Sequence, residues 1–329
     1  MRLLLSGYYG FSNLGDEAIL AGLTRELTRR GHSVTVLSAD PAETAERYGV
    51  QASHRTRGLV PAVLRSDAVV SGGGGLLQDA TSARSLTYYL SVLRLARRLG
   101  KKVAVYGQSL GPLSPEGRGR VARALRDVPA FWRDEVSRSL ARELGLDDRA
   151  TADAALLLAP ERPAGADANG PVLLVPRAGH PAYNKALARV ARALMSEGTP
   201  VATAALHAGH DDAEVEALKR VAPGLQVWTT GSPEELLVLL PNASFVVSAR
   251  LHGCVLAAAA GVSFAALSYD PKVAGFAERF AAPTFAAPVD EDALVATARA
   301  RWPLDMDVRE AQVRLAREGV GALLEALGA

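Results

Sequence analysis

The sequence predicts an α/β fold with two parallel-sheet domains that face a cleft. Short apolar runs alternate with longer helical patterns from the N-terminus onward, which is typical of strand-helix-strand units and therefore of a parallel sheet. The alternation is interrupted at residues 160–170, which are rich in Pro, Gly and Ala, and then starts again. A chain of 329 residues is long enough for two such domains, each with its own core.

The first half opens with an apolar strand at residues 2–6, and the helix that follows it ends at Gly31. This opening favours a parallel sheet. Further strands are expected at 34–37, 67–70, 103–106 and 130–132, and helices at 15–30, 85–99, 115–125 and 135–144.

The second half repeats the pattern. Strands are expected at 172–175, 201–204, 225–228, 245–247 and 264–267, with helices between them and a long amphipathic helix at 308–327. We therefore divide the chain into an N-terminal Rossmann-like domain at 1–160, a linker at 161–170, a C-terminal Rossmann-like domain at 171–300 and a terminal segment at 301–329.

The composition excludes several classes of function. Lys and Arg total 37 against 35 Asp and Glu, and a net charge of +2 is too small and too evenly spread to indicate nucleic-acid binding. Cys254 is the only cysteine, so no intrachain disulfide or cysteine-based zinc site is expected. The N-terminus lacks a secretory apolar region and no stretch is typical of a membrane span, so we expect a cytoplasmic protein.

The clearest candidate site is the turn at Arg250 and His252. The apolar run 245–247 predicts a buried strand and the Ala-rich run 254–260 a helix, so both side chains lie where a strand passes into a helix. In open parallel sheets this turn borders the ligand crevice, and the free N–H groups of the helix favour an anion. A guanidinium and an imidazole there suit an anionic substrate that also exchanges a proton. The alternative is that Arg250 makes an ion pair and His252 caps or packs.

Two glycine-bearing loops are further candidates. Residues 7–17 join the first strand to the first helix, where Asn13 and Asp16 are placed to cap the helix or to reach a ligand. Four consecutive glycines, including Gly73 and Gly74, follow another strand. The backbone N–H groups of such a run can surround a phosphate, whereas the alternative is a flexible turn. Neither loop has the spacing of a dinucleotide-binding motif.

Other polar residues give weaker signals. Arg133 and Arg177 each follow a strand, where either could bind a carboxylate through two hydrogen bonds. Two histidines and two aspartates at 207–212 match no usual zinc spacing, so loop residues and a helix cap are the favoured interpretation. The basic helix at 85–102 is interpreted as a crossover helix with a solvated face, and contact with an anionic membrane surface is the alternative.

Six blocks of sequence, in order, resemble the polysaccharide pyruvyl transferase family. They are residues 10–20, 72–79, 107–112, 133–135, 248–252 and 269–273. Six blocks in the same order are more specific than any one motif. Within the family the chain is most similar to the CsaB type, which acts on secondary cell wall polysaccharide.

The resemblance implies a two-domain GT-B fold in which a C-terminal helix crosses back to the first domain, as the segment 301–329 would do. It also implies that the enolpyruvyl group of phosphoenolpyruvate is added to two hydroxyls of a sugar as a ketal, with release of phosphate. The implied acceptor is N-acetylmannosamine in a lipid-linked or oligosaccharide precursor, a step of cell wall biogenesis that serves S-layer anchoring. The first domain would take the acceptor and the second the phosphoenolpyruvate.

Ketal formation from phosphoenolpyruvate requires residue types that are present in the matched blocks. Cations suit a donor that carries both a phosphate and a carboxylate. His252 is expected to move one proton, because the pKa of histidine is ordinarily near neutral, and Asp16 or Asp79 to move the other. The resemblance maps the family's functional arginine, histidine and lysine onto Arg133, His252 and Lys272, with Arg250 as a further donor contact. The predicted catalytic set is His252, Asp16 and Arg133, and the predicted substrate-binding set is Arg250, Lys272, Asn13, Gly73, Gly74, Gln78, Asp79, Arg177 and Leu251.

The expected partners are phosphoenolpyruvate and a sugar acceptor, with no cofactor, no metal and no nucleic acid. Peripheral contact with the cytoplasmic face of the inner membrane is an open alternative, and the sequence does not determine the oligomeric state. Two other functions stay open on the residues alone. One is a GT-B glycosyltransferase that uses a nucleotide sugar, and the other is a non-catalytic protein that binds sugar or phosphate.

Overall fold

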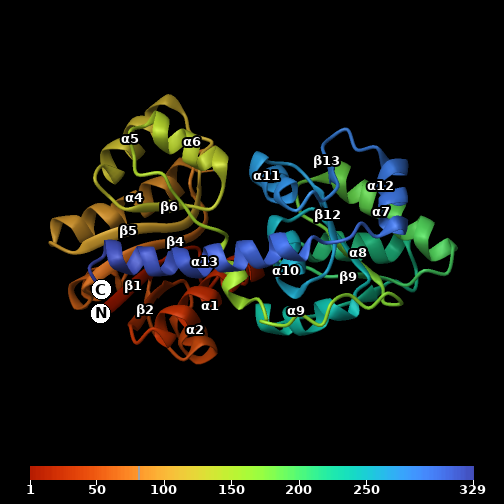
Figure 1. Ribbon diagram of the computed structural model, residues 1–329, viewed down its shortest axis with the longest axis horizontal. Coiled ribbons are helices and arrows are strands. Elements are labelled where there is room, and N and C mark those ends of the chain that lie inside the picture. The colour runs from red at the N-terminus through yellow and green to blue at the C-terminus, as the bar shows by residue number, and fades with distance from the viewer. Residues whose placement is uncertain (81) are drawn as a thin grey trace. The chain divides into compact units, whose positions relative to one another are not determined.

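The computed structural model describes residues 1–80 and 82–329 (Figure 1). Their contacts divide the chain into two compact units, each built on one parallel sheet. Unit 1 comprises Met1–Ser12, Asp16–Leu157 and Val313–Ala329, and unit 2 comprises Asn13–Gly15 and Leu158–Gln312.

In the described part of unit 1, seven strands form a sheet in the order β3-β2-β1-β4-β5-β6-β7, and all neighbours are parallel. The strands are β1 (Arg2–Ser6), β2 (Ser33–Ser38), β3 (Gln51–His54), β4 (Ala68–Leu77), β5 (Lys102–Leu110), β6 (Ala130–Trp132) and β7 (Arg149–Ala150). The central strands are apolar and almost fully buried, because helices cover both faces.

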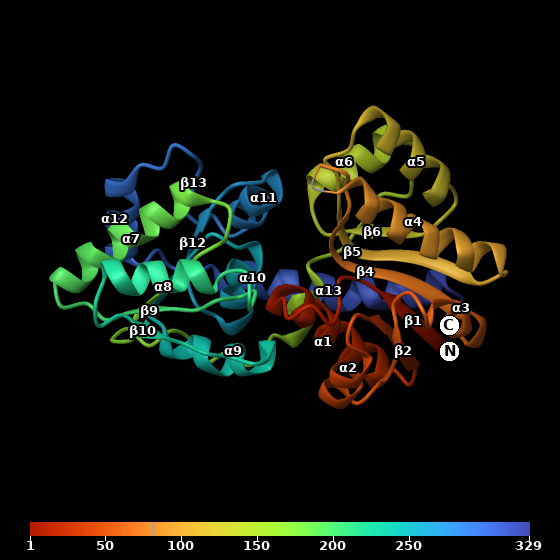
Figure 2. The same ribbon diagram turned by 180° about the vertical axis from the view of Figure 1, so that it is seen from behind.

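The helices of unit 1 divide between the two faces as right-handed crossovers require. The chain winds from β1 outward to β3 and then returns to β4, so α1 and α2 lie on one face and α4, α5 and α6 on the other (Figure 2). The core on the second face contains Leu86, Leu90 and Leu93 of α4. These helices are α1 (Leu14–Arg29), α2 (Pro41–Tyr48), α3 (Leu59–Arg65), α4 (Ala83–Arg98), α5 (Pro115–Leu125) and α6 (Glu135–Glu143).

Unit 2 has the same plan, with a described sheet of six parallel strands in the order β10-β9-β8-β11-β12-β13. The strands are β8 (Val172–Val175), β9 (Val201–Thr203), β10 (Gln226–Val227), β11 (Phe245–Ser248), β12 (Phe264–Leu267) and β13 (Thr284–Phe285). The helices are α7 (Pro181–Ser196), α8 (Asp212–Val221), α9 (Pro233–Leu239), α10 (Leu251–Ala260), α11 (Pro271–Arg279) and α12 (Glu291–Ala300).

Each sheet reverses its strand order once, and the reversal marks where a ligand binds in such folds. In unit 1 the reversal lies between β1 and β4, and in unit 2 between β8 and β11. The loops at the carboxyl ends of the two strands diverge there and leave a crevice. The loop after β1 in unit 1 contains Gly7 and Gly10, and the loops after β8 and β11 in unit 2 contain Arg177 and Arg250.

The last helix, α13 (Met306–Ala326), contributes to both units. Within unit 1, the hydroxyl of Tyr106 donates a hydrogen bond to the carbonyl of Ala316 at 2.7 Å. Within unit 2, Arg309 is 2% exposed. Its guanidinium donates to the carbonyls of Pro160 at 2.8 Å and Ala259 at 2.7 Å.

The predicted fold class is confirmed, but several elements differ from expectation. The sequence reasoning missed α2, β3 and α3, because β3 reads Gln-Ala-Ser-His and α3 is short, so neither has a clear apolar period. It also placed the four glycines after a strand. They lie inside β4, which stays paired with β5 as far as Leu77 despite an irregular register after Gly74.

The basic helix of the sequence analysis is α4, the crossover between β4 and β5. Its cations bind the carbonyl ends of other helices. Arg97 donates to the carbonyls of Ala124 and Arg126 beside α5, and Lys101 donates to those of Leu64 and Ser66 at the end of α3. Among the described residues, no helix combines the length and apolar character that a membrane crossing requires.

Replacing Arg309 by alanine should destabilise the fold, because it leaves buried carbonyl groups without their charged donor. We expect a loss of about 2 to 4 kcal/mol in the free energy of unfolding, measured by urea denaturation. The exposed Arg314 of the same helix is the control, and Arg314→Ala should change stability by less than about 0.5 kcal/mol. Equal stability of the two variants would contradict this stabilising role of Arg309.

Candidate active site

The turn between β11 and α10 is shaped by Ser248. Its hydroxyl accepts a hydrogen bond from the N–H of Arg250 at 3.0 Å and donates to the carbonyl of the same residue at 2.7 Å. Position 253 must be glycine, because a Cβ there would lie 2.2 Å from the Ser248 hydroxyl oxygen. Arg250 occupies the N-cap position of α10 without a capping bond from its side chain. The turn therefore places the N-terminus of α10, where the helix dipole favours an anion, beside Arg250.

A buried carboxylate holds Arg250 in place. Asp211 is fully buried, its Oδ1 accepts from Nη2 of Arg250 at 2.6 Å, and its Oδ2 lies 2.5 Å from Nε. The same carboxylate accepts the backbone N–H groups of Ala178 and His207, both at 3.1 Å. One side chain thus joins the loops that follow β8, β9 and β11. Asp211 occupies the N-cap position of α8, as predicted, but its carboxylate bonds to these loops and not to the N–H groups of α8.

Arg177 brings a second guanidinium to this cluster. Asn184 fixes its backbone, accepting from the N–H at 3.1 Å and donating to the carbonyl at 2.8 Å. The guanidinium lies 4.3 Å from the centre of the Tyr269 ring, and its buried Nε has no hydrogen-bond partner among the described residues. Burial lowers the pKa of Arg177, and the nearby charge of Arg250 adds to this. Two close guanidinium groups with only one buried carboxylate favour a bound anion.

His180 belongs to the same cluster, although the sequence analysis did not identify it. Its ring centre lies 4.6 Å from that of Tyr269. Burial lowers the pKa of His180, and Arg177 and Arg250 lower it further. In the sequence it is only a histidine five residues after the end of β8, and this signal is too weak to identify it. The imidazole is therefore neutral near pH 7 and becomes easier to protonate when an anion offsets the arginines.

His252 lies in the first turn of α10 against the backbone of Gly15. A Cβ at position 15 would be 2.1 Å from Nδ1 of His252, so only glycine leaves room for the ring. The neighbouring residues bind the β9 loop, since the N–H of Leu14 donates to the carbonyl of Leu206 at 2.8 Å and Asn13 pairs with His207. This packing explains why Asn13–Gly15 belong to unit 2 by their contacts.

Lys272 stands at the start of α11. Asp270 caps this helix by accepting from the N–H of Lys272 at 3.0 Å, and its carboxylate lies 3.1 Å from the ammonium group. Asp270 also acts electrostatically on Arg177, which places this turn beside the arginine cluster. Unit 2 thus brings Arg177, Arg250 and the Lys272 turn together at one sheet edge.

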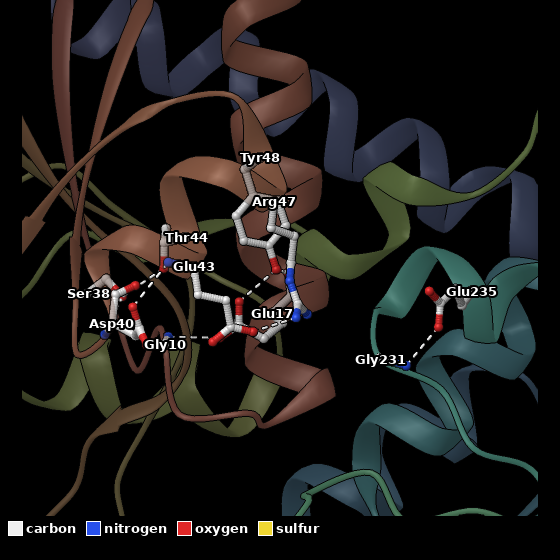
Figure 3. A network of polar contacts seen from close by, with 10 residues as sticks. All are labelled: Gly10, Glu17, Ser38, Asp40, Glu43, Thr44, Arg47, Tyr48, Gly231 and Glu235. Atoms are coloured by element: carbon white, nitrogen blue, oxygen red, sulfur yellow. Dashed lines mark hydrogen bonds and ion pairs between the residues drawn. The ribbon is translucent and has the colours of Figure 1, made fainter.

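In unit 1, the loop after β1 is fixed by Glu17 (Figure 3). The carboxylate is 4% exposed and accepts from the N–H of Gly10 at 2.8 Å and from the hydroxyl of Tyr48 at 2.6 Å. Burial raises the pKa of Glu17. Glu17 lies in the first turn of α1, as predicted, and its side chain anchors this loop to α2.

The glycines of β4 lie against this loop. Gly73 and Gly74 have φ values of +66° and +77°, which disfavour other residues. A Cβ at Gly74 would lie 2.8 Å from Oδ1 of Asp16, so the backbone of β4 and the Asp16 carboxylate meet at the strand end. Unit 1 therefore presents a carboxylate and a close-packed glycine backbone at its own reversal point.

Comparison with known proteins identifies the family of this chain. A model of the family named "Polysaccharide pyruvyl transferase" matches residues 13–271. The chain belongs to this family. It is therefore a transferase, and the family connects it with pyruvyl transfer to a sugar or polysaccharide acceptor.

Solved structures confirm a GT-B-like fold. UDP-GlcNAc 2-epimerase from Neisseria meningitidis bound to UDP-GlcNAc has a TM-score of 0.65 at 11% identity, covering 99% of this chain and 100% of that one. UDP-N-acetylglucosamine 2-epimerase from Rickettsia bellii has a TM-score of 0.62 at 10% identity, with coverages of 100% and 97%. A glycosyltransferase from Rickettsia africae has a TM-score of 0.58 at 11% identity, with coverages of 99% and 95%. At these identities the similarity shows the fold alone.

Two other residues expected in the pyruvyl transferase site, Arg133 and Leu251, are buried. Arg133 is 5% exposed, its Nη1 donates to Asp153 at 2.6 Å and its Nε to the hydroxyl of Ser109 at 2.9 Å. Leu251 is 5% exposed and is the first residue of α10, so its side chain is buried. Both residues are thus built into the fold around the strand ends.

Two predicted polar residues follow β4 directly. Gln78 is half-buried. The Asp79 carboxylate accepts from the N–H and the hydroxyl of Ser114 at 2.8 and 2.6 Å, and the hydroxyl lowers the pKa of Asp79. In the described residues no three His, Cys, Asp or Glu side chains gather as a metal site would require.

Gly15→Ala should impair catalysis more than folding. The added Cβ displaces the His252 ring, and a displacement of about 1 Å at a reacting group costs about a hundredfold in rate. We expect kcat to fall at least tenfold in a pyruvyl-transfer assay. Gly119→Ala in α5 is the matched control, because a Cβ there meets no atom within 4 Å. If both variants keep full activity, the position of His252 does not matter for turnover.

Anion binding should raise the pKa of His180. A bound dianion offsets the charges of Arg177 and Arg250, which hold this pKa below its ordinary value. Since binding then takes up protons, affinity should increase as the pH falls through the interval between the two pKa values. An NMR titration of the histidine Cε1–H signals with and without inorganic phosphate measures the shift. His32, whose pKa is lowered by burial and by the N-terminal ammonium, should not respond.

Proposed function

We propose that this protein transfers the enolpyruvyl group of phosphoenolpyruvate to two hydroxyls of one sugar residue, forming a ketal and releasing phosphate. The observation that supports this most is the pair of arginines, Arg177 and Arg250, beside the N-terminus of α10. Phosphoenolpyruvate carries a phosphate and a carboxylate on three carbons. Two guanidinium groups, the helix N–H groups and Lys272 match this density of negative charge.

The proposed reaction needs a group that protonates carbon and a group that takes protons from the hydroxyls. The first hydroxyl adds to the central carbon of the donor and loses its proton, while the methylene carbon takes up a proton and becomes a methyl group. The bond from that carbon to the phosphate oxygen then breaks, and the second hydroxyl attacks the same carbon and loses its proton, which leaves with the phosphate. His252 is our choice for one transfer. For the other we favour Asp16, whose carboxylate lies at the glycine backbone of β4, over Asp79, whose lowered pKa makes it a weaker base.

Arg133 is part of this proposal as a positioning residue. Its guanidinium is held by Asp153 and Ser109 inside unit 1, so its proposed contribution is to fix the ends of β5 and β6. No cofactor and no metal are required by the proposed chemistry, because the donor itself carries the group that is transferred.

We further propose N-acetylmannosamine of a lipid-linked secondary cell wall polysaccharide precursor as the acceptor, with the enzyme in the cytoplasm and in peripheral contact with the membrane. Exposed apolar residues of α3 support such a contact. Val60 and Leu64 are 49% and 54% exposed, one helical turn apart, next to Lys101. Arg97, Lys101 and Lys102 line an open pocket of about 440 Å³ in this region. Co-sedimentation with anionic vesicles tests the contact, and absence of binding would remove this part of the proposal.

The decisive assay measures phosphate release from phosphoenolpyruvate with and without a synthetic N-acetylmannosamine disaccharide, and the mass of the acceptor in the same tube. Acceptor-dependent phosphate and a mass gain of one pyruvate less one water are expected. Turnover of a nucleotide sugar without phosphoenolpyruvate would instead establish a glycosyltransferase. Binding without turnover of either donor would indicate a sugar- or phosphate-binding protein.

Asp211→Asn should weaken donor binding while the protein still folds. The amide keeps the volume of the carboxylate but removes its charge, so Arg250 loses its orienting partner. We expect the KM for phosphoenolpyruvate to rise about tenfold or more, equivalent to about 1.4 kcal/mol. Asp212→Asn, next in sequence and exposed, should leave KM unchanged. An unchanged KM in both variants would exclude Arg250 from donor binding.

A further inference from the structure

We propose that the aromatic stack around Tyr8 and Phe11 in unit 1 is a carbohydrate subsite that binds the pyranose ring of the acceptor. That the bound sugar is the acceptor rests on the proposed function, whereas binding of a sugar does not. The sequence analysis assigned no role to these aromatic residues, and none of them is in the predicted sets.

The stack is built from separate segments of unit 1. Tyr8 and Phe11, both partly exposed in the loop after β1, stack with ring centres 4.1 Å apart and 9° between their planes. The guanidinium of Arg55, which follows β3, lies 5.2 Å from the Phe11 ring and 4.2 Å from the Tyr88 ring. Tyr88 of α4 meets Tyr89 edge to face at 5.1 Å.

The loop that carries the stack is held before any ligand arrives. Glu17 binds the N–H of Gly10, between Tyr8 and Phe11 in sequence (Figure 3). The hydroxyl of Tyr88 donates to the carbonyl of Arg55 at 2.8 Å, which fixes the Arg55 segment against α4. A preorganised aromatic surface loses little entropy when a flat ligand binds.

Two buried polar atoms of the stack have no hydrogen-bond partner among the described residues. They are the hydroxyl oxygen of Tyr89, a residue that is only 1% exposed, and Nε of Arg55. Buried donors without partners are rare in folded proteins, because each costs free energy that a hydrogen bond would recover. Their position in one stack indicates a polar ligand that supplies the missing partners.

The surroundings fit a neutral polyol with an apolar ring face. Burial raises the pKa of Tyr8 and of Tyr89, and the Asp16 carboxylate raises both further, so both phenols remain donors. Asp16 itself lies at the glycine backbone of β4 and can accept from a sugar hydroxyl. An aromatic face attracts the C–H edge of a pyranose, and the Arg55 Nε–H and the Tyr89 hydroxyl suit the acetamido carbonyl and ring hydroxyls.

Saturation-transfer NMR with methyl N-acetyl-β-mannosaminide, in the absence of phosphoenolpyruvate, tests the subsite. The wild type and Tyr8→Phe should bind the sugar, and Tyr8→Ala should weaken binding about tenfold by losing the stacked face. Trp302→Ala is the matched control, since Trp302 is 48% exposed in unit 2 and should not affect binding. Equal binding by Tyr8→Ala and the wild type would overturn the proposal. Uridine is the competing probe, and Tyr8-dependent binding of uridine but not of the sugar would assign the stack to a nucleobase and overturn it as well.

Tyr89→Phe separates ligand binding from a structural role. Removing a hydroxyl without a protein partner should leave the melting temperature unchanged or raise it, while sugar affinity falls. A lower melting temperature with unchanged sugar affinity would show that the hydroxyl stabilises the fold.

In the transfer assay, Tyr8→Ala should raise the KM for the acceptor and not the KM for phosphoenolpyruvate. Sugar binding without any pyruvyl transfer would reject the proposed function and support the subsite. Pyruvyl transfer with an acceptor KM that Tyr8→Ala does not change would support the proposed function and reject the subsite.

Discussion

The buried ion pair between Asp211 and Arg250 is the constraint on which the arrangement in unit 2 depends. A carboxylate without water must be compensated by strong donors, and Asp211 finds them in Arg250 and in the N–H groups of Ala178 and His207. These donors come from the ends of three parallel strands, so satisfying one charge fixes three loops. Arg177 lies beside this pair, and the buried Nε of its guanidinium has no hydrogen-bond partner among the described residues, an arrangement that suits an anion.

The same physical arrangement appears twice in the chain with different chemistry. Each sheet reverses its winding once, and the loops at the reversal diverge. Unit 2 places arginines and a helix N-terminus there, which suits a phosphate and a carboxylate. Unit 1 places glycines, a carboxylate and stacked aromatic rings there, which suits a neutral sugar. The division is compatible with a family named for pyruvyl transfer to polysaccharide.

The candidate residues that could be proposed from the sequence are those singled out by local patterns. Arg250 and His252 were recognisable because a buried strand precedes them and an Ala-rich helix follows, and Gly73 and Gly74 because consecutive glycines are costly without a purpose. Asp211 and His180 were not recognised, because their partners lie tens of residues away. Arg133 was expected at the substrate, yet a partner twenty residues further on, Asp153, holds it inside the fold.

The sequence by itself determined the alternation of strands and helices, the class of fold and the family, because apolar periodicity and short motifs act over a few residues. Only the tertiary structure decided which charges are compensated, which glycines make room for a neighbour, and which aromatic side chains meet. Gly15 illustrates the difference: its place in a motif is visible in the sequence, but the reason for it is the ring of His252, more than two hundred residues away. Burial and hydrogen bonding depend on contacts between distant segments, and these exist only once the sheets have formed.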